Sequence, residues 1–371
     1  MTESAARALV RRGVSLWLDD LSRDRIVGGG LQSLIDRFGV SGVTTNPTIF
    51  AAALAHSTAY GPALHRLAEQ GVPAADAALR LMTEDVAAAA DVLAPVHAAT
   101  DGADGWVSIE VGADVAHDAT ATVTEARHLH ALVARPNVFV KIPATPAGLH
   151  AITAAIAEGI SVNVTLIFGL ARYGQVVDAY LGGLERAAER GLDLGGIRSV
   201  ASFFVSRVDG EVDARLGAVD SIAAAQLAGA VAIANSRLAV EAFDERFGSE
   251  RAVRLLERGA HPQPLLWAST GVKDPRMPDT RYVDALATPG SIITMPEATL
   301  RAVADHGAPG ELRDLPADAA RAVLGRLADV GVSYEDVVET LERRGIEQFE
   351  RSGRELIRTV DAALAAAGEA A

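Results

Sequence analysis

Two lysines stand out in a chain that carries its other positive charges as arginine. Among the 34 Lys and Arg residues, only Lys141 and Lys273 are lysines. Lys141 lies in the apolar, β-branched stretch "NVFVKIPAT" (137–145). An arginine stays protonated at any accessible pH, whereas a lysine amine that has lost its proton is a nucleophile. Lys141 is therefore a candidate for imine (Schiff-base) chemistry. The alternative is a strand-end lysine that reaches water or pairs with an acid.

The composition is that of an acidic, cysteine-free globular chain. Its 371 residues, 49% apolar and 22% charged, fit a single α/β barrel with a large core. The net charge of −14 argues against nucleic acid or an anionic membrane as a partner. The absence of cysteine excludes disulfides, thiol nucleophiles and Cys-type zinc sites, and it fits a cytoplasmic location. The first residues contain no apolar signal core, and no apolar run is long enough to span a membrane.

Short β-branched runs alternate with longer stretches of helical period. Eight runs are expected to be strands: 14–19, 42–46, 106–111, 138–143, 161–168, 199–209, 264–270 and 291–296. In one intervening stretch Leu149, Ile152 and Ile156 share a helix face. Eight strand–helix units predict a (β/α)8 TIM barrel rather than an open doubly wound sheet. No strand-linked GxGxxG supports a dinucleotide-binding sheet, and the glycine-rich "VGGGLQSL" (27–34) is expected to be a loop.

The additional helices are expected to belong to the same unit. We expect one barrel domain over residues 1–371, with a helical insertion at about 50–105 and a C-terminal helical extension at about 312–371. Helices are predicted at about 297–306 and 316–368, where apolar residues recur at helical spacing.

Side-chain alternation sorts the polar strand residues onto one face. In "VFVKIP" the aliphatic Val138, Val140 and Ile142 should meet the helices, so Lys141 points into the barrel. The same parity turns polar or ionisable residues of other strands inward, namely Asp19, Thr44, Asn46, Ser108, Glu110, Asn163, Thr165, Ser202 and Ser206. They lie in the middle or at the C-terminal ends of strands, where barrel enzymes build their sites. Buried charge is costly unless it is paired or functional, so this coordinated set favours a catalytic Lys141.

A phosphate site is expected where strands six and seven end. Arg207 is placed at the end of strand six, and Ser269 and Lys273 follow strand seven. Loops in this part of such barrels often bind phosphate, to which hydroxyls and cations would donate. The alternative is that Arg207 pairs with Asp209 or Asp213, and Lys273 with Asp274. No histidine joins an acidic cluster with metal-ligand spacing, so neither a metal nor a cofactor is expected.

The ordered motifs resemble those of transaldolases. "GVTTNPTIF", "WVSIEV", "VFVKIPAT", "SVNVTLIF", "SFFVSRVD", "WASTGVKDP" and "TMPE" occur in the family's order over about residues 14–300, and the match is closest to the long bacterial form. The resemblance implies a Schiff-base (class I) enzyme that moves a dihydroxyacetone unit between sugar phosphates. Sedoheptulose 7-phosphate and glyceraldehyde 3-phosphate would give erythrose 4-phosphate and fructose 6-phosphate, in the non-oxidative pentose phosphate pathway.

The resemblance also implies roles for single residues. Lys141 would form the imine, Asp19 would be the acid/base at the C4 hydroxyl, and Glu110 would act through a water oriented by Thr165. The dihydroxyacetone hydroxyls would be bound by Asn46, Asn163 and Ser202. Phe204 would line the site, and Arg207 would bind the phosphate. Burial would favour a neutral Lys141 amine, whereas the two carboxylates would favour the ammonium, and the sequence leaves this balance open.

Several alternatives remain at this point. Many family members place an arginine in the strand-seven phosphate loop, where this chain offers Ser269 and Lys273. A register slip would exchange Asp19 and Asp20. An aldolase on the same scaffold would release free dihydroxyacetone, although the small fructose-6-phosphate aldolases carry Gln and Tyr at the positions of Glu110 and Phe204. A non-catalytic sugar-phosphate-binding barrel and a metal-dependent barrel enzyme are further rivals. Family members occur as monomers and homodimers.

Overall fold

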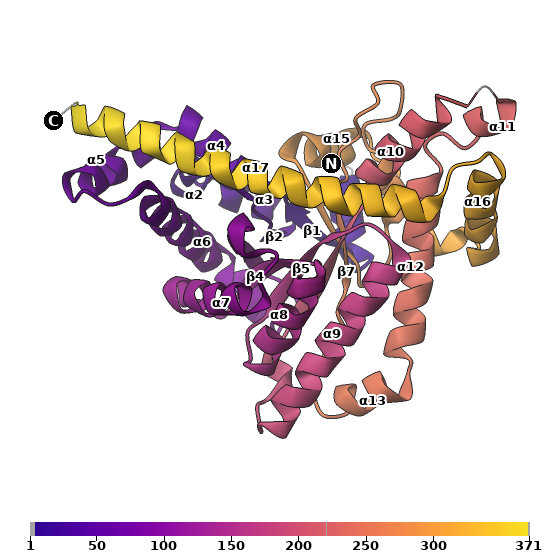
Figure 1. Ribbon diagram of the computed structural model, residues 1–371, viewed down its shortest axis with the longest axis horizontal. Coiled ribbons are helices and arrows are strands. Elements are labelled where there is room, and N and C mark those ends of the chain that lie inside the picture. Colours follow the sequence, from indigo (N-terminus) through magenta and orange to yellow (C-terminus); the bar gives the residue numbers. More distant parts are fainter. Residues whose placement is uncertain (1–3, 220, 370–371) are drawn as a thin grey trace.

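A closed barrel of eight parallel strands forms the centre of the computed structural model, which describes residues 4–219 and 221–369 (Figure 1). The strands follow one another in chain order, and the pairing of β1 with β8 closes the ring. They are β1 (Ser15–Leu18), β2 (Val40–Val43), β3 (Trp106–Glu110), β4 (Val138–Pro143), β5 (Val162–Ile167), β6 (Ser199–Phe204), β7 (Leu265–Ala268) and β8 (Ile292–Met295). The predicted (β/α)8 barrel is confirmed, and the open doubly wound sheet is excluded.

Helices surround the barrel and fill the connections between its strands. Before β5 they are α1 (Ala5–Arg11), α2 (Arg23–Val27), α3 (Gly30–Phe38), α4 (Pro47–His56), α5 (Gly61–Glu69), α6 (Ala74–Ala99), α7 (Ala119–Val133) and α8 (Pro146–Ala157). After β5 they are α9 (Leu170–Glu189), α10 (Ser206–Leu216), α11 (Ile222–Ala225), α12 (Val231–Phe247), α13 (Glu250–Leu256), α14 (Arg281–Leu286), α15 (Glu297–His306), α16 (Ala317–Asp329) and α17 (Tyr334–Glu369). Short 3-10 turns occupy Thr58–Tyr60, Ala113–Val115, Leu194–Gly196 and Leu312–Asp314.

Two predicted strands extend too far toward their C-terminal ends. The strand predicted at 42–46 is Val40–Val43, because the side chain of Asn46 accepts a hydrogen bond from the Ile49 amide and caps α4. The strand predicted at 199–209 ends at Phe204, and α10 begins at Ser206. Alternating polarity in "VSRVD" imitates a strand, but Val208 and Val212 are buried one helical turn apart. Arg207 therefore lies in the first turn of a helix.

The glycine-rich segment predicted as a loop is partly helical, which corrects that prediction. Gly30 begins α3, whose face of Leu31, Leu34 and Phe38 is buried. Gly29 and Gly39 flank this helix with φ of 72° and 78°, a left-handed conformation that glycine adopts without strain. The glycines thus limit the helix instead of preventing it.

Aromatic side chains form the floor of the barrel. The rings of Trp106 and Phe139 stack with centroids 4.1 Å apart, and Trp17 stacks on Phe139 at 6.2 Å. Gly42 makes room for this floor, because a Cβ atom there would lie 2.4 Å from the indole of Trp17. Each of these three aromatic residues precedes an inward polar residue of its strand by two positions. They therefore share a strand face with Asp19, Glu110 and Lys141, as the predicted alternation requires.

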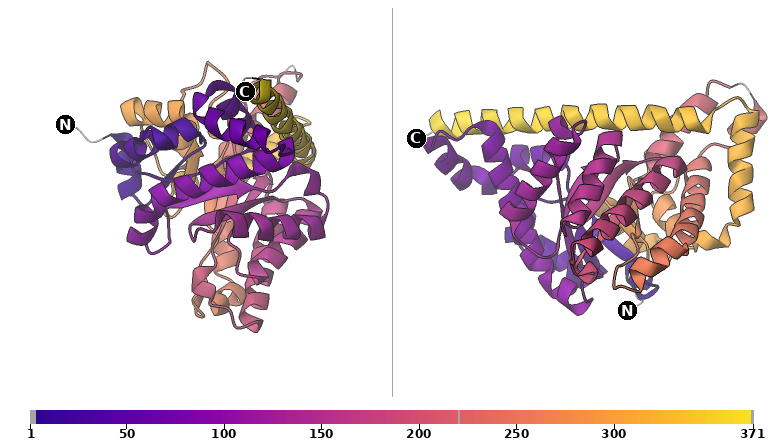
Figure 2. Two further views of the ribbon diagram at one scale, coloured as in Figure 1. Left: turned by 90° about the vertical axis from the view of Figure 1, so that its left-hand side faces the viewer. Right: turned by 60° about the horizontal axis from the view of Figure 1, so that its bottom comes forward.

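The long helix α17 runs across the mouth of the barrel (Figure 2). It packs against α4, α5 and α6 toward its C-terminal end and against α10 and α16 toward its start. Its buried face consists of Val337, Leu341, Gly345, Phe349, Ser352, Leu356, Val360 and Leu364. Within the described residues, no helix has both the length and the apolar character needed to cross a membrane.

Candidate active site

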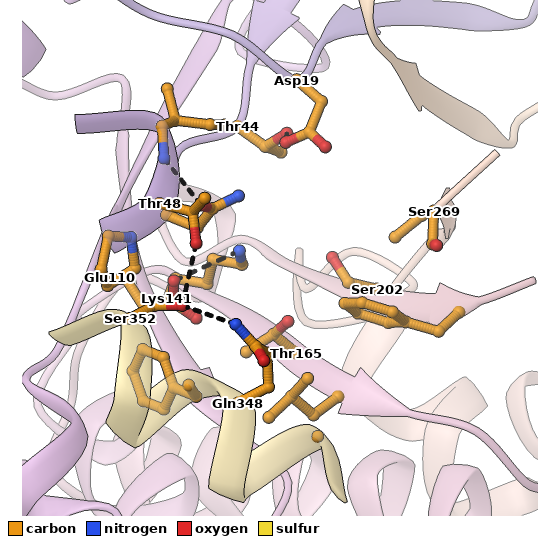
Figure 3. Close-up of a pocket in the computed structure, with 18 of the residues that line it drawn as sticks. Asp19, Thr44, Thr48, Glu110, Lys141, Thr165, Ser202, Ser269, Gln348 and Ser352 are labelled. Carbon is orange, nitrogen blue, oxygen red and sulfur yellow. Dashed lines mark hydrogen bonds and ion pairs between the residues drawn. The ribbon is translucent and has the colours of Figure 1, made fainter. Parts of the chain in front are cut away.

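Lys141 and Glu110 lie side by side on neighbouring strands inside the barrel. They are register partners on β4 and β3, and the Lys141 Nζ lies 3.5 Å from the Glu110 Oε2 (Figure 3). The Lys141 Nζ also donates a hydrogen bond of 3.0 Å to the carbonyl oxygen of Thr45. Both side chains are more than 90% buried. Burial raises the pKa of Glu110, and the charge of Lys141 opposes that rise.

Two oxygens beside the lysine have unused hydrogen-bonding capacity. The Glu110 Oε2 and the Thr165 Oγ1 are both buried and make no hydrogen bond within the described part of the chain. Both side chains line the cavity at the mouth of the barrel. Buried polar atoms without a hydrogen-bond partner are rare, and they mark places where a polar ligand or water can bind.

Asp19 is held by a short chain of hydroxyl groups. The Thr44 Oγ1 donates to the Asp19 Oδ1 at 3.0 Å, and the Oγ1 atoms of Thr44 and Thr294 are 2.8 Å apart. Because Thr44 has one proton and gives it to Asp19, Thr294 must donate to Thr44. Burial raises the pKa of Asp19, while Lys141 and the Thr44 hydrogen bond lower it. The neighbouring Asp20 pairs with Arg25 at 2.5 Å and does not line the cavity.

A second polar chain lies deeper in the barrel. The Asn163 amide donates to the Ser108 hydroxyl at 3.0 Å, and the Ser202 hydroxyl donates to the Asn163 carbonyl oxygen at 2.7 Å. Asn163 is fully buried and does not line the cavity, whereas Ser202 does. Asn163 therefore lies behind the cavity wall, where it orients Ser202.

Two cations lie together at the rim of the cavity where β6 and β7 end. Arg207 and Lys273 line the cavity and form no ion pair within the described residues. The Arg207 guanidinium lies 5.1 Å from the centre of the Phe204 ring. Burial lowers the pKa of both groups, and the charge of Arg207 lowers that of Lys273 further. Such closely placed, partly desolvated cations are suited to an anion.

The acids that could have neutralised these cations have other partners. Asp209 accepts from the Ala232 amide and from the Tyr282 hydroxyl, and Asp213 accepts from the Gly229 amide. Asp274 pairs with Arg276 at 2.7 Å. The alternative that Arg207 and Lys273 only form ion pairs with these acids is thus excluded.

Ser269 takes part in the same rim. Its φ of 55° is left-handed, which is uncommon for a residue with a side chain, and its hydroxyl lies 3.0 Å from that of Ser206. Strained backbone of this kind persists where the surroundings require it and is concentrated at functional sites. The hydroxyls, Arg207 and Lys273 together form one polar rim at the ends of β6 and β7.

All predicted site residues except Asn163 line one cavity of about 630 Å³. The structure adds lining residues that the sequence interpretation did not place in the site, namely Thr48, Thr294, Gln348, Phe349 and Ser352. Thr44, which was predicted to point inward, lines the cavity as well. The sequence does contain a sign that α17 contributes to the site. Gly345 and Ser352 occupy the helix face on which the other buried positions are mostly aliphatic or aromatic.

Comparison with known proteins assigns the chain to a family. Residues 16–360 match the family model described as transaldolase/fructose-6-phosphate aldolase. The chain belongs to this family. The transaldolase of Thermobifida fusca is 54% identical over 364 residues, which cover 98% of this chain and 99% of the relative. Transaldolase 1 of Streptomyces avermitilis is 53% identical over 363 residues (96% and 94% coverage), and the transaldolase of Frankia alni is 51% identical over 357 residues (96% of each).

Proposed function

We propose that this chain is a transaldolase that transfers a dihydroxyacetone unit through an imine on Lys141. The observation that carries the proposal is the buried pair of Lys141 and Glu110 on adjacent strands, at 3.5 Å, in a cavity that also holds Asp19. The full-length relatives named transaldolase support the reaction type. An amine, a proton donor and a base in one desolvated cavity are the groups that imine-based carbon–carbon cleavage requires.

The first half of the reaction forms the imine. The neutral Lys141 amine attacks the C2 carbonyl of the ketose phosphate, and the resulting carbinolamine loses its hydroxyl group as water. Glu110 supplies the proton for that departure, and its raised pKa favours the protonated form that can do so. Thr165 is placed to orient the water, since its buried hydroxyl has no other partner among the described residues.

The second half breaks and remakes a carbon–carbon bond. Asp19 takes the proton from the C4 hydroxyl, the C3–C4 bond breaks, and its electrons pass into the iminium to give an enamine. The aldose phosphate leaves, and the enamine stays attached to Lys141. The acceptor aldose phosphate then enters, C3 attacks its aldehyde carbon, and Asp19 returns the proton. Hydrolysis of the new imine releases the product ketose and frees the lysine.

The rim residues would bind the phosphate group of each sugar. Arg207, Lys273 and Ser269 offer two cations and a hydroxyl at the ends of β6 and β7. Ser202 and Asn46 also line the cavity, and they would bind the dihydroxyacetone hydroxyls. Substrates would be sedoheptulose 7-phosphate and glyceraldehyde 3-phosphate, giving erythrose 4-phosphate and fructose 6-phosphate in the non-oxidative pentose phosphate pathway.

We also place the enzyme in the cytoplasm, as a monomer or a homodimer. The cysteine-free composition and the sugar phosphate substrates support this location. The net charge of −14 supports a protein that binds no nucleic acid. Light scattering of the purified chain distinguishes the two oligomeric states.

A coupled transfer assay tests the proposal. Fructose 6-phosphate and erythrose 4-phosphate are supplied, and formation of glyceraldehyde 3-phosphate is followed through a coupled reductase. We expect turnover by the wild-type chain and none by Lys141→Arg, because arginine keeps the charge but cannot form an imine. Thermal unfolding of both proteins is the control for folding. Transfer by a folded Lys141→Arg variant would contradict the imine mechanism.

A further inference from the structure

A second, smaller pocket lies beside the active-site cavity, between α17 and the starts of α8 and α9. We call this space of about 270 Å³ the outer pocket. His117, Arg343 and Glu347 line it and are exposed to solvent. Its walls also carry the ion pair of Arg172 with Glu342, at 2.9 Å. Exposed and charged side chains keep their hydration, so the outer pocket is a wet recess of the surface.

Leu166 separates the outer pocket from the active-site cavity. Among the residues that the structure describes, it is the only one that lines both spaces. Its side chain packs against a small apolar cluster of Ala113, Ala116 and Phe349, the last of which belongs to α17. A Cβ atom at Gly345 would lie 3.5 Å from the Leu166 side chain, so the backbone of α17 passes close to this leucine. The wall between the two spaces thus consists of one leucine side chain and the helix that it contacts.

The backbone of β5 is distorted where it places Leu166 in this wall. Strict alternation would direct Leu166 away from the face of Thr165, because successive strand residues point to opposite faces. Instead, the pairing of β5 with β6 shifts register between Val164 and Ile167, and Leu166 has a φ of 61°. Both Thr165 and Leu166 line the active-site cavity as a result. Left-handed backbone is strained for leucine, and such irregularities redirect side chains beside active sites.

The leucine wall adjoins the residue that is placed to orient the reactive water. Thr165 precedes Leu166, and its carbonyl oxygen accepts a hydrogen bond of 2.8 Å from the amide of Ala144, which lines the outer pocket. Transfer requires the enamine to persist until an acceptor arrives. If Asp19 instead returns its proton to C3, water can add to C2 of the iminium, and dihydroxyacetone leaves with recovery of the Lys141 amine. Exclusion of water prevents such hydrolysis of a reactive intermediate.

We propose that Leu166 determines reaction specificity, favouring transfer over hydrolysis by keeping the water of the outer pocket away from the enamine. This inference rests on the proposed transaldolase function. The imine cycle releases one water molecule and consumes one, which Glu110 and Thr165 handle, so no further supply from solvent is needed. Water that entered beside Thr165 from the outer pocket would not have to pass an acceptor in the mouth of the barrel. The strained position of Leu166 closes that route.

The test measures how the enamine partitions between transfer and release. Fructose 6-phosphate and erythrose 4-phosphate are supplied at saturating concentrations to the wild type, Leu166→Ala and Leu166→Asn. Free dihydroxyacetone and sedoheptulose 7-phosphate are quantified in the same reaction. Alanine removes most of the wall, and asparagine shortens it while tolerating left-handed backbone. We expect the ratio of released to transferred units to rise roughly two- to tenfold in both variants, which corresponds to about 0.4–1.4 kcal/mol between the two barriers.

Two matched variants separate the wall from general packing, and thermal unfolding checks that every variant is folded. Leu166→Met keeps the side-chain volume, and Ile346→Ala truncates a residue of α17 that lines the outer pocket but not the active-site cavity. Both should keep the wild-type ratio.

Three outcomes would overturn the role of Leu166. An unchanged ratio in the folded Leu166→Ala and Leu166→Asn variants would show that the wall does not limit hydrolysis. A lower ratio would show that Leu166 only supports Thr165, and an equal rise in Ile346→Ala would assign the effect to looser packing of α17. A wild type that transfers nothing would instead refute the proposed function.

Discussion

The hydroxyl chain behind Asp19 predicts a specific change in pH dependence. In Thr44→Val the side chain keeps its shape but loses the proton that Thr44 donates to the Asp19 carboxylate at 3.0 Å. The ionised form of Asp19 is then less stable, so its pKa, already raised by burial, rises further. Donor cleavage needs ionised Asp19, and therefore the acid limb of kcat/KM moves to higher pH.

The size of the shift follows from the strength of that hydrogen bond. A hydrogen bond to a charged group contributes about 1.5–3 kcal/mol, and about 1.4 kcal/mol corresponds to one pKa unit. Asp19 faces the cavity, where water replaces part of the lost bond, so we expect a rise of about one unit. Thr294 also loses its acceptor in this variant, which should lower the free energy of unfolding by about 1–3 kcal/mol.

The assay is the pH profile of kcat/KM for fructose 6-phosphate, which reports ionisation in the free enzyme. Thr44→Ser keeps the hydroxyl and should leave the acid limb in place. Adding Thr294→Val to Thr44→Val removes the unpaired hydroxyl and should recover part of the lost stability. An acid limb that is identical in wild type, Thr44→Val and Thr44→Ser would refute the assignment of this limb to Asp19.

Three further predictions follow from the site. Asp19→Asn should abolish cleavage yet raise the free energy of unfolding at pH 7, by about 1.4 kcal/mol for each unit by which folding raises the pKa of Asp19. This gain should vanish below the unfolded pKa of about 3.9, where Asp19 is protonated in both states, and urea unfolding at the two pH values measures it. Lys273→Met should raise KM for fructose 6-phosphate at least about tenfold through loss of a charged hydrogen bond, with little change for unphosphorylated fructose; equal effects on both sugars would contradict phosphate binding. Phe204→Tyr combined with Glu110→Gln should increase release of free dihydroxyacetone, and an unchanged product ratio would show that these positions do not control the outcome.

Strand parity allowed much of the barrel interior to be predicted from sequence. Alternating aliphatic residues in β4 place Lys141 inward because the helices outside require an apolar face. The same rule gave Glu110 and Thr165, both of which line the cavity. The choice of Asp19 over Asp20 also agrees with the structure, because Asp20 pairs with Arg25.

Parity failed where the chain leaves the sheet. Alternation in "VSRVD" extends past Phe204, but the backbone of Val205 turns there and α10 begins at the next residue. Arg207 still reaches the rim, from a helix instead of a strand. Asn46 likewise lines the cavity while capping α4, a role that strand periodicity does not reveal.

Contacts between distant segments could not be predicted from local pattern. Thr48 and Ser352 are separated by 304 residues, and only the closed fold brings their hydroxyls to 2.9 Å. Among the described residues Arg207 and Lys273 form no ion pair, because Asp209, Asp213 and Asp274 bind other partners. Such competition for partners is decided by tertiary packing.

Borohydride trapping tests the central claim most directly. The protein is incubated with fructose 6-phosphate, reduced with borohydride and digested, and the modified peptide is located by mass. Our account predicts a dihydroxyacetone-sized adduct on Lys141, which would demonstrate the imine and the cleavage together. A folded protein that binds the sugar phosphate but carries no adduct on Lys141 would contradict it.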